Sequence, residues 1–323
     1  MASLTAPARA WSRRLALLWL GAVVAAAALA PVLPLPYSPG FPDLAHVAQP
    51  PFGPGRHWLG TDPLGRDVLS SLVFGARNAV LLTLPAAVLA ALLGAVAGGA
   101  AGFWGNGLRL PVPYWQLALG AGWWALGLPA TGPVCAALGA AAAAVAWRHQ
   151  RSLPTWPVPL NAAVMGAATA LDTIPRLVLV VALAAGAGVS APGLLALFAL
   201  TAWPHPARLV RAQILRVRVL PFVEAARAAG VPAGRVWLRH ALPHAILPLR
   251  TALPLSLASL LGLESTLSFL GIGLPPDVAS WGRLVAMVRG EPTAWWLLIF
   301  PSSCLIATIL ALNTLARTRP DTA

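Results

Sequence analysis

The chain has 323 residues, of which 58% are hydrophobic and only 10% are charged, and its mean hydropathy is +0.75. These values exclude an ordinary soluble domain and indicate a protein with several membrane-spanning segments. The net charge is +13, but most basic residues flank apolar runs, as in the cytoplasmic loops of membrane proteins, so we expect no nucleic-acid binding.

All 22 basic residues are arginines, and this excludes several kinds of chemistry. A chain without lysine supplies neither the phosphate-binding lysine of a Walker A loop nor the amine of a Schiff-base enzyme. The two cysteines, Cys135 and Cys304, lie in separate apolar segments, so the sequence predicts no disulfide framework and no CxxC metal site. We therefore expect neither a cofactor nor a metal in this chain.

The first apolar run, residues 15–35, follows Arg13 and Arg14 and resembles a signal peptide with an A-x-A site at residues 28–30. Pro31 directly after that site disfavours cleavage, and the run is long enough to cross a bilayer, which takes about 20 residues. We predict an uncleaved first span with a cytoplasmic N-terminus.

Further apolar runs give eight candidate spans in total, of which the third and fourth are short and weak. A cytoplasmic N-terminus then places the arginine-rich connections, and the C-terminus, on the cytoplasmic side, as the positive-inside rule requires. The runs after the first cover residues 79–103, 114–128, 134–147, 158–185, 192–203, 245–272 and 295–315.

Small residues and prolines mark contact and bending positions in these runs. Gly94, Gly98 and Gly102 recur every four residues and so lie on one helix face, where another backbone can approach closely. The stripe serves either assembly with another chain or packing within this one, and the Ala-rich context favours the second. Proline kinks are predicted at residues 85, 175, 248 and 254.

A polar, arginine-rich insert at residues 208–243 separates two apolar runs. Residues 222–229 favour a helix with Glu224 near its positive end, and Gly230 follows as a C-terminal stop. A second short helix is predicted over residues 233–241, before Pro243. The pair forms either a water-exposed docking element or an interfacial element that lies on lipid headgroups.

Few acidic residues fall within the predicted spans, namely Asp172 and Glu264. An intramembrane carboxyl marks a transport path or a hydrogen-bonded contact inside the bundle. Glu264, with Ser268 one turn later, is therefore a candidate pore-lining group, and a structural role is equally compatible with the sequence. A stand-alone ion-coupled transporter, which needs such carboxyls, stays an alternative.

An integral-membrane enzyme is a weaker alternative, with His46, His57, Asp62 and Asp67 as acid, base or metal ligands. No H-x-x-x-H motif or paired-carboxylate spacing supports it. Asp62 and Asp67 flank Gly65-Arg66, which is more typical of a turn with an ion pair.

Several stretches together resemble a known family. Glu224-Ala225-Ala226, Gly230 and Leu242-Pro243 resemble the EAA loop of bacterial ABC importer permeases. More narrowly, the chain resembles the second permease of dipeptide, oligopeptide and nickel importers over nearly all its length outside residues 105–160. The stretches that carry this likeness are LGTDPLGRDVLSSLVFGAR (59–77), ARLVRAQIL (207–215), LSFLGIGLPP (267–276) and SWGRLV (280–285).

The resemblance implies an all-α polytopic membrane protein with a six-span ABC importer permease core, to which residues 106–160 add a transmembrane hairpin. The chain then divides into a tail and first span (1–35), an external loop (36–78) and a permease transmembrane domain (79–323) with a cytoplasmic coupling loop (207–243). It would form half of a translocation pore for peptides or similar small solutes in the bacterial cytoplasmic (inner) membrane. It would not be an enzyme.

The resemblance also implies partners. These are a sister permease in a heterodimer, two ATP-binding subunits that carry the ATP, and an extracytoplasmic substrate-binding protein, besides membrane lipid. The residues implied in coupling to the ATPase are Glu224, Ala225, Ala226, Arg227, Gly230, Leu242 and Pro243.

Overall fold

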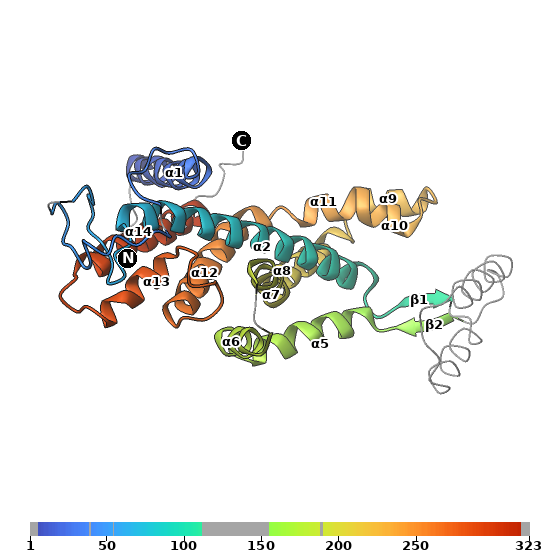
Figure 1. Cartoon of the computed structure of the whole chain (residues 1–323). Helices are drawn as coiled ribbons and strands as arrows, with labels where there is room; N and C mark the ends of the chain where they lie inside the picture. Colours follow the sequence, from blue (N-terminus) through green and yellow to red (C-terminus); the bar gives the residue numbers. More distant parts are fainter. Residues whose placement is uncertain (1–5, 39, 54, 112–154, 188–189, 318–323) are drawn as a thin grey trace, which may run out of the picture.

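The computed structural model describes residues 6–38, 40–53, 55–111, 155–187 and 190–317, and these are largely helical (Figure 1). Helix α2 (Val68–Trp104) has 37 residues and forms the centre of the bundle; at 1.5 Å per residue it is about 55 Å long. Helix α1 (Ala6–Leu29) packs against α2 and against α14 (Trp296–Arg317), and Trp19 Nε1 donates to Thr308 Oγ1 at 3.0 Å. The amino- and carboxyl-terminal helices therefore close one side of the bundle.

The other elements follow α2 in chain order. They are β1 (Leu108–Pro111), β2 (Thr155–Val158), α5 (Leu160–Thr173), α6 (Arg176–Ala187), α7 (Ala191–Ala202), α8 (Pro204–Val217), α9 (Pro221–Ala228), α10 (Ala233–Val236), the π-helix η1 (Trp237–Ala241), α11 (Leu242–Ala245), α12 (Leu249–Phe269), α13 (Trp281–Ala286) and the 3-10 helix η2 (Met287–Arg289).

The part of the chain that the structure describes contains 4 helices long and apolar enough to cross a membrane: Trp11–Leu29, α2, α12 and α14. A fifth span results if α5 and most of α6 are taken together, although they are bent by 84° at their junction. The predicted span 192–203 is helix α7, with only 12 residues, and Trp203 alone separates it from α8. The predicted arms 114–128 and 134–147 lie outside the described residues.

The structure differs from the sequence prediction at three places. Helix α2 begins at Val68, not at residue 79, because Asp67 caps it by accepting a hydrogen bond from Ser70 N at 2.8 Å. The expected external loop 36–78 is thus shorter at its carboxyl end. Pro248 is the N-cap residue of α12 and does not kink its interior. The bend at Pro175 is much sharper than a kink, since the helix stops at Thr173 and resumes at Arg176.

A short antiparallel ribbon is the exception to the helical fold. Strand β1 pairs with β2 in a register that places Leu108 opposite Val158 and Pro111 opposite Thr155. Next to the ribbon, Asn161 N donates to Gly105 O at 3.0 Å. The two ends of the predicted insertion 106–160 therefore lie side by side.

The glycine stripe of α2 packs against α8 and the residue before it. A Cβ atom on Gly94 would stand 2.8 Å from Trp203 O, one on Gly98 2.7 Å from Ala207 Cα, and one on Gly102 3.0 Å from Arg211 O. Real side chains do not approach a backbone this closely, so the absence of side chains brings the two helices together. The stripe makes a contact within the chain, the option that the sequence favours.

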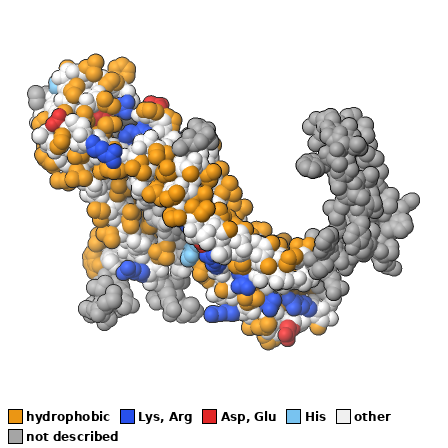
Figure 2. Space-filling model, turned by 90° about the horizontal axis from the view of Figure 1, so that it is seen from below, with side chains coloured by type: hydrophobic (Ala, Val, Ile, Leu, Met, Phe, Trp, Pro, Cys, Tyr) orange, Lys and Arg blue, Asp and Glu red, His pale blue; other side chains and the backbone are white. Residues whose placement is uncertain are grey.

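Polar and apolar side chains separate along the molecule. On the face shown in Figure 2, arginine side chains gather near the two ends, and hydrophobic side chains cover much of the surface between them. Figure 1 places the connection between α1 and α2 (residues 30–67, the α1–α2 connection) and helices α9–α11 near opposite ends of α2. This is the distribution expected for a bundle that crosses a bilayer.

Candidate coupling surface and membrane cavity

The predicted docking element is a compact unit of short helices, residues 221–245, called here the α9–α11 unit. Gly230 ends its first helix with φ +76°. Gly230 N donates to Arg227 O at 2.9 Å, and Val231 N donates to Ala226 O at 3.1 Å. This pair of bonds is the Schellman arrangement, in which a glycine in the left-handed region closes a helix. The predicted helix and its stop at Gly230 are confirmed.

The unit is anchored by an apolar base. Val223 and Val236 are fully buried and belong to a hydrophobic cluster with Phe103 of α2 and Ile214 of α8. The Arg227 guanidinium carbon lies 5.0 Å from the centre of the Phe103 ring, a cation–π contact that ties α9 to the end of α2. The base of the unit therefore packs against the ends of α2 and α8.

The exposed side of the unit carries charged residues beside apolar ones, including Phe222 and Leu238. Glu224, Ala225 and Arg227 are exposed on α9, while Ala226 is half-buried toward the base. Pro243 is also exposed. Leu242 turns inward and would contact a Cβ on Gly99 at 3.0 Å, so it belongs to the anchor rather than to the exposed side.

The second predicted helix, 233–241, is present but is not regular. It consists of α10 and the π-helix η1. A π turn widens the helix by one residue, a feature that often occurs at functional sites. The sequence carried no clear signal for it.

A cavity of about 500 Å³ lies at the α5–α6 bend. Its walls come from the bend itself and from α7 and α12. Arg176 Nη1 donates to Ser259 Oγ at 3.4 Å across one wall, and Asp172 is ion-paired with Arg208 of α8. The polar side chains among the lining residues are Asp172, Arg176, Thr201, Ser259 and Thr266. The sequence pointed to Asp172 and Pro175, but not to Arg176.

Glu264 and Ser268 do not line this cavity, and in this conformation of the single chain they line no open surface. Glu264 is 2% exposed, and its carboxylate accepts from Ser268 Oγ at 2.9 Å and from Ser280 Oγ at 3.0 Å. The bonds join α12 to the start of α13. A hydrogen-bonded carboxyl inside the bundle, the structural alternative for Glu264, is thus the arrangement found.

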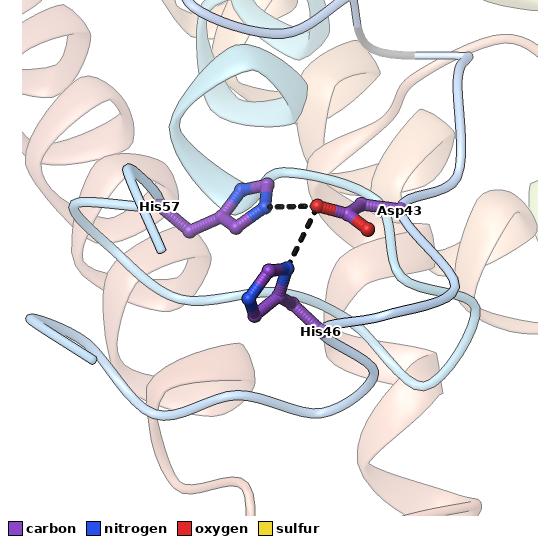
Figure 3. A group of neighbouring side chains, drawn as sticks. All are labelled: Asp43, His46 and His57. Carbon is purple, nitrogen blue, oxygen red and sulfur yellow. Dashed lines mark hydrogen bonds and ion pairs between the residues drawn. The ribbon is translucent and has the colours of Figure 1, made fainter. Parts of the chain in front are cut away.

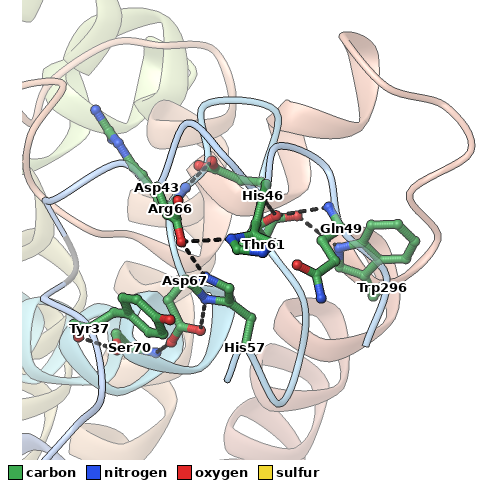
Figure 4. A network of polar contacts seen from close by, with 11 residues as sticks. Tyr37, Asp43, His46, Gln49, His57, Thr61, Arg66, Asp67, Ser70 and Trp296 are labelled. Atoms are coloured by element: carbon green, nitrogen blue, oxygen red, sulfur yellow. Dashed lines mark hydrogen bonds and ion pairs between the residues drawn. The ribbon is translucent and has the colours of Figure 1, made fainter. Parts of the chain in front are cut away.

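The α1–α2 connection is held by a polar network (Figure 4). Asp62 Oδ1 accepts from Leu64 N and Arg66 N, both at 2.8 Å, and Trp296 Nε1 of α14 donates to Thr61 O at 3.0 Å. Burial raises the pKa of Asp62, although these backbone bonds oppose the shift. The turn predicted around Gly65 is present.

Asp62 therefore serves the backbone, while Asp67 caps α2 through Oδ2 and meets His57 Nδ1 through Oδ1 at 3.0 Å. In contrast, Asp43, which the sequence did not single out, meets both His46 and His57. Hydrogen bonds from His46 and then from His57 lower the pKa of Asp43, so its carboxylate is ionised at neutral pH.

Known proteins resemble this chain over most of its length. Residues 156–318 match the family described as "Binding-protein-dependent transport system inner membrane component". A "Putative peptide transport system permease protein" of Brucella suis is 31% identical over 304 residues, which are 94% of this chain and 83% of the relative. The "Dipeptide transport system permease protein DppC" of Bacillus subtilis is 26% identical over 263 residues, 80% of this chain and 65% of the relative.

The family match begins inside strand β2 and extends beyond α14, so it includes the α5–α6 bend and the whole α9–α11 unit. The Brucella relative extends the likeness to most of the remaining chain. The chain therefore belongs to the family of binding-protein-dependent transport system inner membrane components and is a multi-pass permease of the inner membrane.

Proposed function

We propose that the chain is one permease subunit of an ATP-driven importer of peptides, and that the α9–α11 unit couples it to separate ATPase subunits. The observation that carries the proposal is the combination of an exposed Glu224 with a buried anchor directly beneath it. The names of the relatives support peptides as the cargo class.

The α9–α11 unit has the features of a mechanical coupling element. Its exposed side carries charge of both signs, with Glu224 beside Arg227, and Arg235 and Arg239 nearby in the chain, as a surface for a folded protein partner requires. Its base packs on α2 and α8, which also pack along the glycine stripe. Movement of the α9–α11 unit would be transmitted through α8 to the α5–α6 bend, because Arg208 of α8 is ion-paired with Asp172.

The cavity at the α5–α6 bend is the proposed segment of the transport route. Cationic Arg176 and the hydroxyls of Ser259 and Thr266 line it, and anionic Asp172 lies at the same bend. Peptides carry a carboxylate and an amine at their ends, so a wall with both charges and hydroxyl groups suits them. A sister permease would complete the route on its open side.

The proposed sidedness places both termini and the α9–α11 unit in the cytoplasm, and the α1–α2 connection outside. The arginine distribution supports this orientation. Two ATP-binding subunits would contact the chain inside, and a substrate-binding protein would deliver the peptide from outside. The alternative of a stand-alone ion-coupled transporter has less support, because Asp172 is already ion-paired and Glu264 is buried among serines.

Charge reversal at Glu224 tests the proposal. The tagged full chain, with Glu224→Arg, is expressed in its native host and captured from detergent extracts, and co-purified ATPase activity and peptide uptake are measured. We expect both to fall at least tenfold, which corresponds to about 1.4 kcal/mol, while the amount of chain in the membrane stays the same. Exposed Glu224 makes no contact that the fold needs.

Asp277→Arg is the matched control, because Asp277 is also exposed but lies in the connection between α12 and α13. It should leave ATPase retention at the wild-type level. Retention of the ATPase by Glu224→Arg at that same level would refute the coupling role.

A further inference from the structure

Three potential metal ligands meet in the α1–α2 connection (Figure 3). His46 Nδ1 lies 2.9 Å and His57 Nε2 3.3 Å from the same atom, Asp43 Oδ2. The three ligand atoms all lie within 4.8 Å of one another. Ligands about 2.0–2.1 Å from one zinc ion are separated by similar distances.

The hydrogen bond on the far side of His57 decides what its Nε2 presents to Asp43. His57 Nδ1 lies 3.0 Å from Asp67 Oδ1, and a carboxylate oxygen can only accept, so Nδ1 carries the proton. Nε2 is then left to face Asp43 Oδ2, the same atom that His46 Nδ1 approaches. A cation bound by these three atoms fits the arrangement.

The bond to Asp67 is also the arrangement that orients histidine ligands in metal sites, where a carboxylate holds the ring nitrogen that does not bind the metal. His57 is 1% exposed, and its ring stacks on Tyr37 with 3.9 Å between ring centres. The ring is thus fixed in place before any ion arrives. Asp67 is itself fixed as the N-cap of α2.

A buried amide beside the cluster gives an independent indication of a polar guest. Gln49 is 7% exposed, and neither its Oε1 nor its Nε2 has a hydrogen-bond partner among the described residues. The three side chains converge on the space beside Gly55. A Cβ atom placed on Gly55 would lie 3.1 Å from His57 Cδ2, 3.2 Å from Gln49 Oε1 and 3.5 Å from His46 Cδ2. An unpaired buried amide is unfavourable, and a metal-bound water would satisfy it.

We propose that Asp43, His46 and His57 bind one zinc ion. Two imidazoles and one carboxylate are a common zinc set with three protein ligands, and water would take the fourth position. The side chains of His46 and Asp43 are 35% and 25% exposed, which leaves the ion a path from solvent. The ion would join residues 43 and 46 to residue 57 of the α1–α2 connection, and His57 is in turn bonded to Asp67, the cap of α2.

Metal titration of the full chain tests the proposal. The chain carries a histidine-free tag, is stripped with a chelator in detergent, and is titrated with Zn²⁺ in competition with a chromophoric chelator. We expect one zinc ion per chain. Loss of a group that hydrogen-bonds to a metal ligand lowers metal affinity about 10–100-fold, so loss of the ligand itself in His46→Ala should lower zinc affinity at least about 100-fold.

His205→Ala is the matched control, because His205 is exposed on α8, far from the cluster in sequence, and should leave zinc affinity unchanged. Cobalt(II) gives a second readout, since its visible absorption spectrum reports nitrogen ligands in the wild type and should change in His46→Ala. Thermal unfolding without metal tests whether His46→Ala folds. If that variant does not fold, His46→Gln is used in its place.

Two results would overturn the proposal. One is wild-type affinity for zinc in the His46 variant, and the other is a wild-type chain that binds no zinc in the titration. Either result would leave the hydrogen bonds of His57 with Asp43 and Asp67 as the explanation of the geometry.

Discussion

Replacement of Gly230 isolates the contribution of backbone conformation to the α9–α11 unit. Gly230 has φ +76°, and no atom lies within 4 Å of a Cβ placed on it. A substituted side chain would therefore meet no neighbour, and the whole effect would come from the left-handed backbone. This conformation costs an alanine about 1–2 kcal/mol, a β-branched valine up to about 3 kcal/mol, and an asparagine least, because asparagine tolerates it.

A cost of about 1–2 kcal/mol changes the population of the closed turn about 5–30-fold. The amide of Val231 reports this closure directly, since it donates to Ala226 O only when the turn is formed. In the full chain, hydrogen exchange measured by mass spectrometry should be about 5–30-fold faster at residue 231 in Gly230→Ala. It should be faster still in Gly230→Val and near wild type in Gly230→Asn.

Gly234→Ala is the matched control. Gly234 is exposed, has open space around its missing Cβ and lies in helix α10 without a positive φ. Alanine should leave exchange unchanged or slow it slightly, because it lowers the entropy of the unfolded chain. Equal exchange in Gly230→Val and wild type, or equal acceleration by Gly234→Ala, would refute the argument from the turn.

Two further predictions concern packing and transport. Gly98→Leu should lower the Tm of the purified chain, because the leucine side chain would collide with the Ala207 backbone at a cost of about 1–3 kcal/mol or more. The control Gly166→Leu should leave the Tm unchanged, because the space around Gly166 is open. An unchanged Tm in Gly98→Leu would contradict the close α2–α8 contact. Arg176→Ala should reduce uptake of a labelled dipeptide while ATPase retention stays intact, because Arg176 lines the cavity. The control Arg250→Ala should transport normally, because Arg250 is exposed and does not line the cavity. Equal uptake by the two variants would show that Arg176 does not contribute to the route.

Local signals made the docking element predictable from sequence. Pro221 starts α9, Gly230 ends it, and both act within one turn of the backbone. The glycine stripe was also readable, since a spacing of four residues defines a helix face whatever it contacts. The family resemblance, carried by motifs in order, named the class of protein that these local features serve.

Features that depend on contacts distant in sequence were not predictable. The start of α2 depends on the Asp67 cap rather than on the first apolar residue, so a hydropathy criterion places it too late. The cluster around Asp43 forms because the backbone of Gln49 pairs with Thr61 and folds the connection back on itself. The size of the α5–α6 bend, and hence the cavity, depends on how α7 and α12 pack against it.

The β1–β2 ribbon has a consequence for how the chain could be rebuilt. Because Leu108 lies opposite Val158, the segment between them enters and leaves the permease at a single point. A tight hairpin turn of about two residues could join such paired strands. The segment could therefore be lengthened, exchanged or removed without altering the path of α2 or α5. During evolution, a permease could gain or lose it as one insertion while its membrane helices keep their positions relative to one another.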